Sequence, residues 1–380
     1  MDKGVRGSEF FLTQCGTCSV ALQAFLKKDG GCMIRRLLFA VAICASEPAA
    51  ACQLPMDHPS FLFGRIVASW HETAKHPLVG RVYDPAKTEP DLQKSQFKSY
   101  CLFADDFWIM ASKPELLLLG EVHDNPEHHR IRESLFQLGA IVTAHLTTDR
   151  AADFARFQDM AKATERTLTL DDFKAWTSWG STAGTTGWND DIARMLFDVS
   201  VQGKIPVYAG DVPRDAIRRV SMEGEAALKQ EEVDRLHIKE PLGPQLDAAA
   251  LTELEDDYCR TLPREALGGM AYAQRYRDAS LADALIKAAE KHGSAVLVAD
   301  NSRVRTDRGV PWYLRQRMTG KTIVSVSLIE VEDGKNDPES YVPRDPDGKP
   351  ATDYILFTPK AKRDDPCAAA TAEARQGAGK

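Results

Sequence analysis

The most regular pattern in the chain is a series of short apolar-rich runs, each followed closely by polar residues. The first run is four consecutive leucines, Leu116 to Leu119, which Gly120 ends. Short continuous runs of this kind are typical of strands buried on both faces of a parallel sheet. The runs cover residues 116–119, 140–144, 205–209, 294–299, 322–329 and 354–357.

Segments with helical signals lie between these runs. Asn125 suits an N-cap and Pro126 a first helical position, so a helix is expected from Pro126 to about Leu138. Ile131, Leu135 and Leu138 recur at helical spacing, which predicts that this face packs on the sheet. Further helices are expected over residues 150–163, 190–202, from Pro213 onwards and over 264–291.

The order of these elements predicts the fold class. Strands alternate with helices, which is typical of an α/β protein with a mostly parallel central sheet and helices on both faces. Residues 224–262 are charged and helical in pattern, and are expected to form a helical insertion rather than a separate domain.

Side chains that carry chemistry follow four of the predicted strands. They are Glu121, His123 and His128 after the first strand, His145 after the second, Asp211 after the third and residues 300–303 after the fourth. The carboxyl ends of parallel strands meet at one edge of a sheet, where open α/β proteins bind their ligands. The pattern therefore predicts one site at this edge, and the alternative is a set of polar turns with solvated histidines.

Composition narrows the choice of partners. The net charge of −7 argues against a nucleic-acid surface. No apolar run reaches the ~18 residues that a membrane-spanning helix needs. The chain also lacks the HExxH, GxSxG, GxGxxG and Walker motifs, so the common hydrolase and nucleotide-binding classes have no support.

The N-terminal part has the layout of a signal peptide. Met33 starts a basic segment, which a nine-residue apolar core and small residues follow. We therefore expect a leader over residues 1–51 with its signal peptide at 33–51. If translation starts at Met33, residues 1–32 are not translated. A buried helix in a longer N-terminus is the alternative.

The cysteines allow two kinds of modification in an exported protein. Cys52 directly follows the small residues and could carry a lipid, although Ala49 stands where lipoproteins usually have leucine. The protein is thus expected in the periplasm or anchored at the outer membrane through Cys52. The cysteines that remain after cleavage are Cys52, Cys101, Cys259 and Cys367. They allow three disulfide pairings, and unpaired thiols are equally open.

Residues 361–380 are expected to be a disordered tail.

A resemblance to a known family adds to this picture. The stretch from Gly120 to His129, GEVHDNPEHH, resembles the signature of the ChaN-like haem-binding uptake proteins of the Tiki and erythromycin-esterase superfamily. Three other pieces agree in the same order, at residues 76–84, 273–278 and 304–314. The resemblance implies a single domain over residues 52–360 and an exported haem-binding protein of haem or iron uptake. It also implies a partner in an outer-membrane or periplasmic haem transport system, and leaves the oligomeric state open, a homodimer included.

The resemblance also implies a set of pocket residues. The expected haem-binding residues are Glu121, His123, His128, His145, Gln274, Arg277, Asp278, Arg303 and Tyr313. The iron ligand is expected to be His123 or Tyr313, with His128 and Tyr83 as further candidates.

Three positions depart from the family pattern. His145 stands where glutamate is usual, Arg132 where glutamine is usual, and Arg303 where the family has a histidine. Arginine does not ligate metal ions, so Arg303 puts a metal site in doubt, but it can clamp a carboxylate such as a haem propionate. The alternative function is a hydrolase, esterase-like or peptidase-like and either metal-dependent or metal-free, with Glu121 and His123 as its base. A pocket with no ligand is the third reading.

Overall fold

The computed structural model describes residues 59–86, 107–108, 110–177, 179, 189–201, 204–365 and 367–368. The expected leader, Cys52 and Cys101 lie outside these residues, so export and lipidation remain predictions. Contacts within the chain group Leu54–Lys380 as one compact unit. Among the described residues, no helix combines the length and the apolar character needed to cross a membrane.

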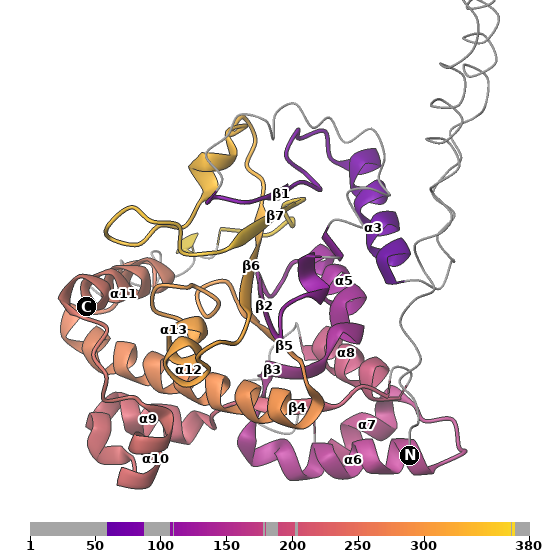
Figure 1. The fold of residues 1–380 in the computed structure, drawn as a ribbon, viewed down its shortest axis with the longest axis horizontal. Coiled ribbons are helices and arrows are strands. Elements are labelled where there is room, and N and C mark those ends of the chain that lie inside the picture. The colour runs from indigo at the N-terminus through magenta and orange to yellow at the C-terminus, as the bar shows by residue number, and fades with distance from the viewer. Residues whose placement is uncertain are drawn as a thin grey trace, which may run out of the picture. The chain divides into compact units, whose positions relative to one another are not determined.

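A sheet that is parallel except at one edge forms the centre of the fold (Figure 1). Its strands are β1 Val82–Tyr83, β2 Leu116–Glu121, β3 Ala140–Thr147, β4 Val207–Asp211, β5 Ala295–Asp300, β6 Ile323–Glu330 and β7 Tyr354–Thr358. The strand order is β1-β7-β6-β2-β5-β3-β4, and the one antiparallel pair is β1 with β7. This confirms the mostly parallel central sheet.

Helices cover both faces of this sheet, as the α/β pattern predicts. Their bounds are α3 Pro59–Thr73, α5 Pro126–Leu135, α6 Ala151–Ala163, α7 Leu170–Thr177, α8 Asn189–Val201, α9 Arg214–Glu223, α10 Gln230–Leu236, α11 Pro244–Asp257, α12 Arg264–His292 and α13 Val310–Arg317. Helices α3 and α5 lie on one side of the central strands, and α12 and α13 on the other (Figure 1).

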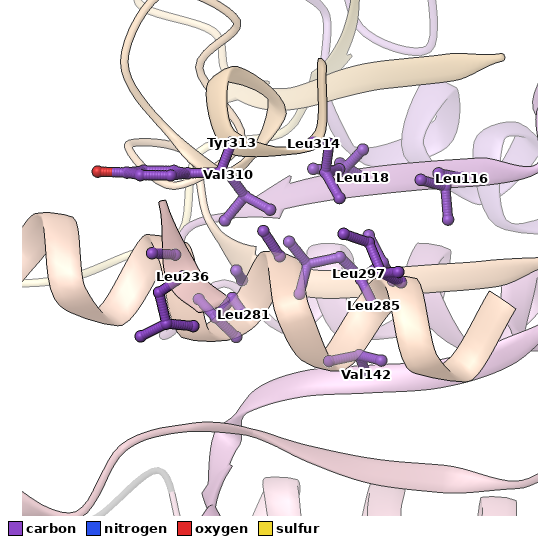
Figure 2. Close-up of a cluster of buried hydrophobic side chains, with 14 of the residues drawn as sticks. Leu116, Leu118, Val142, Leu236, Leu281, Leu285, Leu297, Val310, Tyr313 and Leu314 are labelled. Carbon is purple, nitrogen blue, oxygen red and sulfur yellow. The ribbon is translucent and has the colours of Figure 1, made fainter. Parts of the chain in front are cut away.

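The leucine run of β2 explains why the sheet needs helices on both faces. Successive side chains of a strand point to opposite faces. Leu116 and Leu118 pack with α12 and α13, whereas Leu117 and Leu119 pack with α3 and α5. Figure 2 shows the first of these layers, where Leu314 of α13 lies beside Leu118. All four leucines are at most 2% exposed, so β2 is the buried centre of the molecule.

Two parts of the fold differ from the sequence-based expectation. Helix α3 was not expected, although Phe63, Ile66 and Trp70 recur along it at helical spacing and are buried. The segment after His76 supplies the edge strand β1. It lies outside the apolar runs from which strands were expected, and two strands, β7 and β6, separate it from β2.

The residues just after β7 correct the prediction of a tail that is disordered from residue 361. Ala361 donates a backbone hydrogen bond to Glu330, and Arg363 forms ion pairs with Asp124 and Glu330. Cys367 forms a disulfide with Cys259, just beyond α11. Residues 361–365 and 367–368 are thus held against the fold by charge and by a covalent bond, which composition alone did not indicate.

Candidate functional site

The strand-end edge is built around the turn from β2 into α5. Asn125 caps the helix by accepting a 2.8 Å hydrogen bond from the Glu127 amide. The loop after β5 packs so closely on β2 that a Cβ at Gly120 would collide with Asn301 and Val304. This glycine lets β2 and the loop after β5 approach each other, which brings Glu121 next to Asp300 in the sheet register.

Glu121 is the centre of the site. Its carboxylate is buried and accepts hydrogen bonds from three side chains. Arg132 Nη1 donates to both oxygens, at 2.8 and 2.7 Å, and His145 Nε2 lies 2.8 Å from Oε1. His123 Nδ1 lies 3.2 Å from the same oxygen. Side chains from β3, α5 and the turn after β2 therefore converge on one carboxylate.

The charge of Glu121 is fixed by these neighbours. Burial alone would raise the pKa of Glu121, but the Arg132 guanidinium and the hydrogen bonds from His123 and His145 hold it well below the usual range. Burial lowers the pKa of His145, against the opposing effect of Glu121, so His145 is neutral at pH 7. The pair of Arg132 and Glu121 is thus an ion pair with almost no access to solvent.

His123 links this buried pair to the open side of the site. Its Nε2 pairs with Asp300, and 30% of its side chain is exposed. Burial opposes a charged imidazolium, but the hydrogen bonds to Asp300 and Glu121 outweigh it and raise the pKa of His123 to about 9. Asp300 is held in its ionised form, with its pKa lowered to about 2 against the effect of burial. At neutral pH the two residues form a charged pair at the mouth of the site.

Two more ion pairs line the same edge. Arg303 Nη1 donates to Asp278 Oδ1 across 2.9 Å, and both side chains are at most 5% exposed. Arg277 binds Asp211 at the end of β4 through two nitrogens, and 26% of its side chain is exposed. Burial raises the pKa of Asp278 to about 6, although Arg303 opposes the rise. The edge therefore carries alternating cations and anions.

The structure brings together most of the residues that the sequence singled out. Glu121, His123 and His145 are in direct contact, and Asp300 connects them to Arg303 and Asp278. Gln274 lies next to Asp278 in a pocket between α11 and α12. This pocket is also lined by Glu253, Asp257, Ser302 and Arg308.

Three of the expected ligand candidates lie elsewhere. His128 was expected to point into the pocket, but it is fully buried, accepts a hydrogen bond from the Val122 amide and lies 2.7 Å from Thr358 Oγ1. Tyr313 is 0% exposed in the core between α12 and α13, and its hydroxyl accepts from Arg275. Tyr83 lies on β1 and bonds to Glu339. These residues hold the fold together, because their polar atoms are already satisfied within it.

Two residues of the site were not identified as site residues from the sequence. Arg132 was noted only as a departure from the family, yet it neutralises Glu121. Its position four residues after His128 places both on one face of α5, which is a signal that the sequence contained. Asp257 of α11 was hidden in a charged run. Its pKa is raised to about 6 by partial burial and by the acidic neighbours Glu253 and Asp300.

Several solved structures are similar to this chain at low sequence identity. A Campylobacter jejuni ChaN structure described by its cofacial heme binding is 16% identical, with 66% of this chain and 90% of that chain covered and a TM-score of 0.48. An erythromycin esterase mutant in its open conformation is 10% identical, over 76% and 99% of the two chains, with a TM-score of 0.38. A Bacillus cereus protein is 12% identical, over 80% and 81%, with a TM-score of 0.33.

The curated proteins contain no match to the chain. The family described as "Haem-binding uptake, Tiki superfamily, ChaN" matches residues 107–314, more than half of the chain and the part that holds β2, α5, β3, α12 and β5. This range contains Glu121 and the three side chains described above as hydrogen-bonded to it. The chain therefore belongs to the haem-binding uptake family of the Tiki superfamily that includes ChaN.

Proposed function

We propose that this protein binds haem at the strand-end edge and takes part, after export, in haem or iron uptake. Family membership supports haem binding in general, and one observation in this chain supports the place. His123 and Arg277 are both cationic at neutral pH and both partly exposed, at 30% and 26% of their side chains. Haem carries two propionate groups, and charge-assisted hydrogen bonds from such cations are the usual means of holding carboxylates.

The residues fit the iron end of haem less fully. Bound haem supplies an iron that takes an axial ligand from His, Tyr, Cys or Met. Of the four candidates proposed from the sequence, His128 and Tyr313 are fully buried and Tyr83 lies on the distant strand β1. His123 is thus the one of these four that a ligand can reach, but as a protonated side chain paired with Asp300 it can hold a propionate and cannot ligate the iron.

The experiment is a titration of the mature protein with haemin, followed by absorbance in the Soret region. The variants are His123→Gln and Arg277→Gln. The matched control is His292→Gln, because His292 is exposed at the end of α12, next to the start of β5 and thus at the opposite edge of the sheet. We expect one saturable transition, which His123→Gln and Arg277→Gln each weaken by about tenfold or more and His292→Gln leaves unchanged. Equal affinity in all four proteins would contradict the proposal for this edge.

Export, the transport partner and a homodimer belong to the same proposal. Export can be tested by expressing the full chain in a bacterial host. N-terminal sequencing of the periplasmic and membrane fractions then reports cleavage after Ala51 and any modification of Cys52. Retention of the intact chain in the cytoplasm would contradict the uptake part of the proposal.

The alternative function, a hydrolase that uses Glu121 and His123 as its base, is supported by the side-by-side placement of the two residues. Their electrostatics oppose it. A general base should have a pKa near the working pH, whereas Glu121 is a weakly basic buried carboxylate and His123 is protonated. A screen against ester and peptide substrates tests this alternative, and turnover that His123→Gln abolishes would favour it over haem binding.

A further inference from the structure

Three side chains of the site have the chemistry and spacing of metal ligands. One ligand atom each from Glu121, His123 and His145 lies within 4.8 Å of the others. Two imidazoles and a carboxylate are a ligand set that Zn²⁺ and similar divalent ions bind. Such a group can hold a metal ion only where its ligand atoms are free to face that ion.

In this chain every one of those ligand atoms is already engaged. The ring nitrogens of His123 and His145 that face Glu121 both meet its Oε1, so they act as donors and carry protons. Both Glu121 oxygens also accept from Arg132 Nη1. A guanidinium keeps its proton at any physiological pH and cannot ligate a metal.

We infer that the Arg132 guanidinium is the cation that neutralises the cluster of Glu121, His123 and His145, and that it excludes divalent metal ions from this cluster. Replacing Arg132 with a neutral side chain therefore converts these three residues into a metal site. This inference goes beyond haem binding and does not depend on it.

The position of Arg132 is fixed by the helix that carries it. Its side chain is 0% exposed, so it cannot swing into solvent to make room for an ion. Helix α5 is held at its first turn by the Asn125 cap and by His128, whose ring is bonded at both nitrogens. Further along, Ile131 and Leu135 are fully buried in the core. A divalent ion would have to sit beside a guanidinium that cannot move away, in a site too buried for water to screen the repulsion.

A second observation concerns the donors that Arg132 does not use. Its Nε and Nη2 are buried, and neither has a hydrogen-bond partner among the described residues. Among the described residues, the Arg132 side chain is therefore hydrogen-bonded to Glu121 alone. Replacing it with a neutral side chain removes one interaction and leaves Glu121 as a buried anion that needs a new cation. An uncompensated buried charge is strongly destabilising, so a metal ion that pairs with Glu121 would relieve that cost.

The test uses Co²⁺, whose visible absorption reports tetrahedral coordination, and protein without a histidine tag. The neutral variants are Arg132→Met and Arg132→Gln. Arg132→Lys keeps a positive charge, and the double variant Glu121→Gln/Arg132→Met removes the carboxylate. We expect no saturable binding to the parent protein or to Arg132→Lys. We expect one Co²⁺ per chain with visible bands in the neutral variants, and loss of that binding in the double variant.

Two results would overturn the inference. One is saturable Co²⁺ binding to the parent protein that His145→Ala abolishes, because Arg132 would then not exclude metal. The other is a neutral variant that keeps the parent's near-ultraviolet circular dichroism and still binds no Co²⁺. The parent measurement decides the exclusion even where neither neutral variant folds. Addition of Co²⁺ should also raise the unfolding temperature of the neutral variants only, since a ligand that binds the native state stabilises it.

Discussion

Arg303 donates a 2.9 Å hydrogen bond to Asp278 from the loop after β5 to the middle of α12, and both side chains are buried. A buried positive charge on the loop is thus matched by an acid on the helix. This pair locks the loop after β5 to α12 beside the ligand edge.

Removing Arg303 should therefore be costly. Arg303→Met leaves Asp278 buried without its partner, which should lower the free energy of unfolding by about 3–5 kcal/mol in urea titrations. The control is Arg156→Met. It removes the exposed ion pair of Arg156 with Asp153, which should lower the free energy of unfolding by less than about 1 kcal/mol. Similar losses in the two variants would show that the Arg303 pair contributes no more than a surface pair. The double variant Asp278→Leu/Arg303→Met should regain much of the loss, because it leaves no unpaired charge.

His123 should make the protein less stable as the solution becomes basic. Its pKa is raised from 6.5 to about 9 in the folded protein, where Asp300 and Glu121 outweigh the effect of burial. The folded state therefore binds the proton more tightly than the unfolded state. The stabilisation is fully present below about pH 6.5 and is lost as the pH rises through about 9. It should amount to roughly 2 kcal/mol after allowance for partial exposure. Unfolding measured at pH 6, 8 and 9.5 should show this slope in the parent and not in His123→Gln.

His128 should give a pH dependence of the opposite sign. Burial lowers its pKa from 6.5 to about 4, so the unfolded state binds the proton more tightly. Stability from this residue is present above about pH 6.5 and is lost as the pH falls through about 4, by up to about 3 kcal/mol. The acid limb of the stability curve should be shallower in His128→Gln. That variant should also bind haemin as well as the parent if properly folded, because His128 contacts Val122 and Thr358 rather than the open edge.

The Cys259–Cys367 disulfide should stabilise the protein measurably. It joins residues 108 positions apart, and disulfides that close long loops contribute up to about 5 kcal/mol. Cys367→Ser should lower the urea midpoint, and a thiol reductant should do the same to the parent. The reductant should have no further effect on the variant. Two free thiols at Cys259 and Cys367 in protein folded under oxidising conditions would contradict this prediction.

The strands and the class of fold could be predicted from the sequence because they depend on local composition. The leucine run of β2 and the aliphatic run of β5 are buried on both faces, and such segments are recognisable without knowledge of their neighbours. Helix α3 was missed because prolines and charged residues around it obscured a helical spacing that Phe63, Ile66 and Trp70 do contain.

The site could be predicted in outline and not in its pairings. That strand ends converge follows from topology, so the cluster at Glu121, His145 and Asp300 was foreseeable. Which partner each side chain takes depends on distances set by the whole fold. Arg277 meets Asp211 across 66 positions of sequence, and Arg132 reaches Glu121 through the exact rotation of α5. The likeness to the family also directed attention to Tyr313 and His128, whose roles here are in the core.

The position of β2 in the strand order has a further consequence for how the molecule can be divided. Strands β5, β6 and β7 all belong to the segment that the Cys259–Cys367 bond closes into a covalent ring, but β5 and β6 do not pair with each other. Between them lies β2, which comes from outside the ring and pairs with both. A sheet formed by the strands of the ring alone would thus lack the strand that lies between β5 and β6. If the chain is cut after α11, neither of the two fragments can complete its own sheet. Each fragment should therefore recover native structure only when the other fragment is supplied.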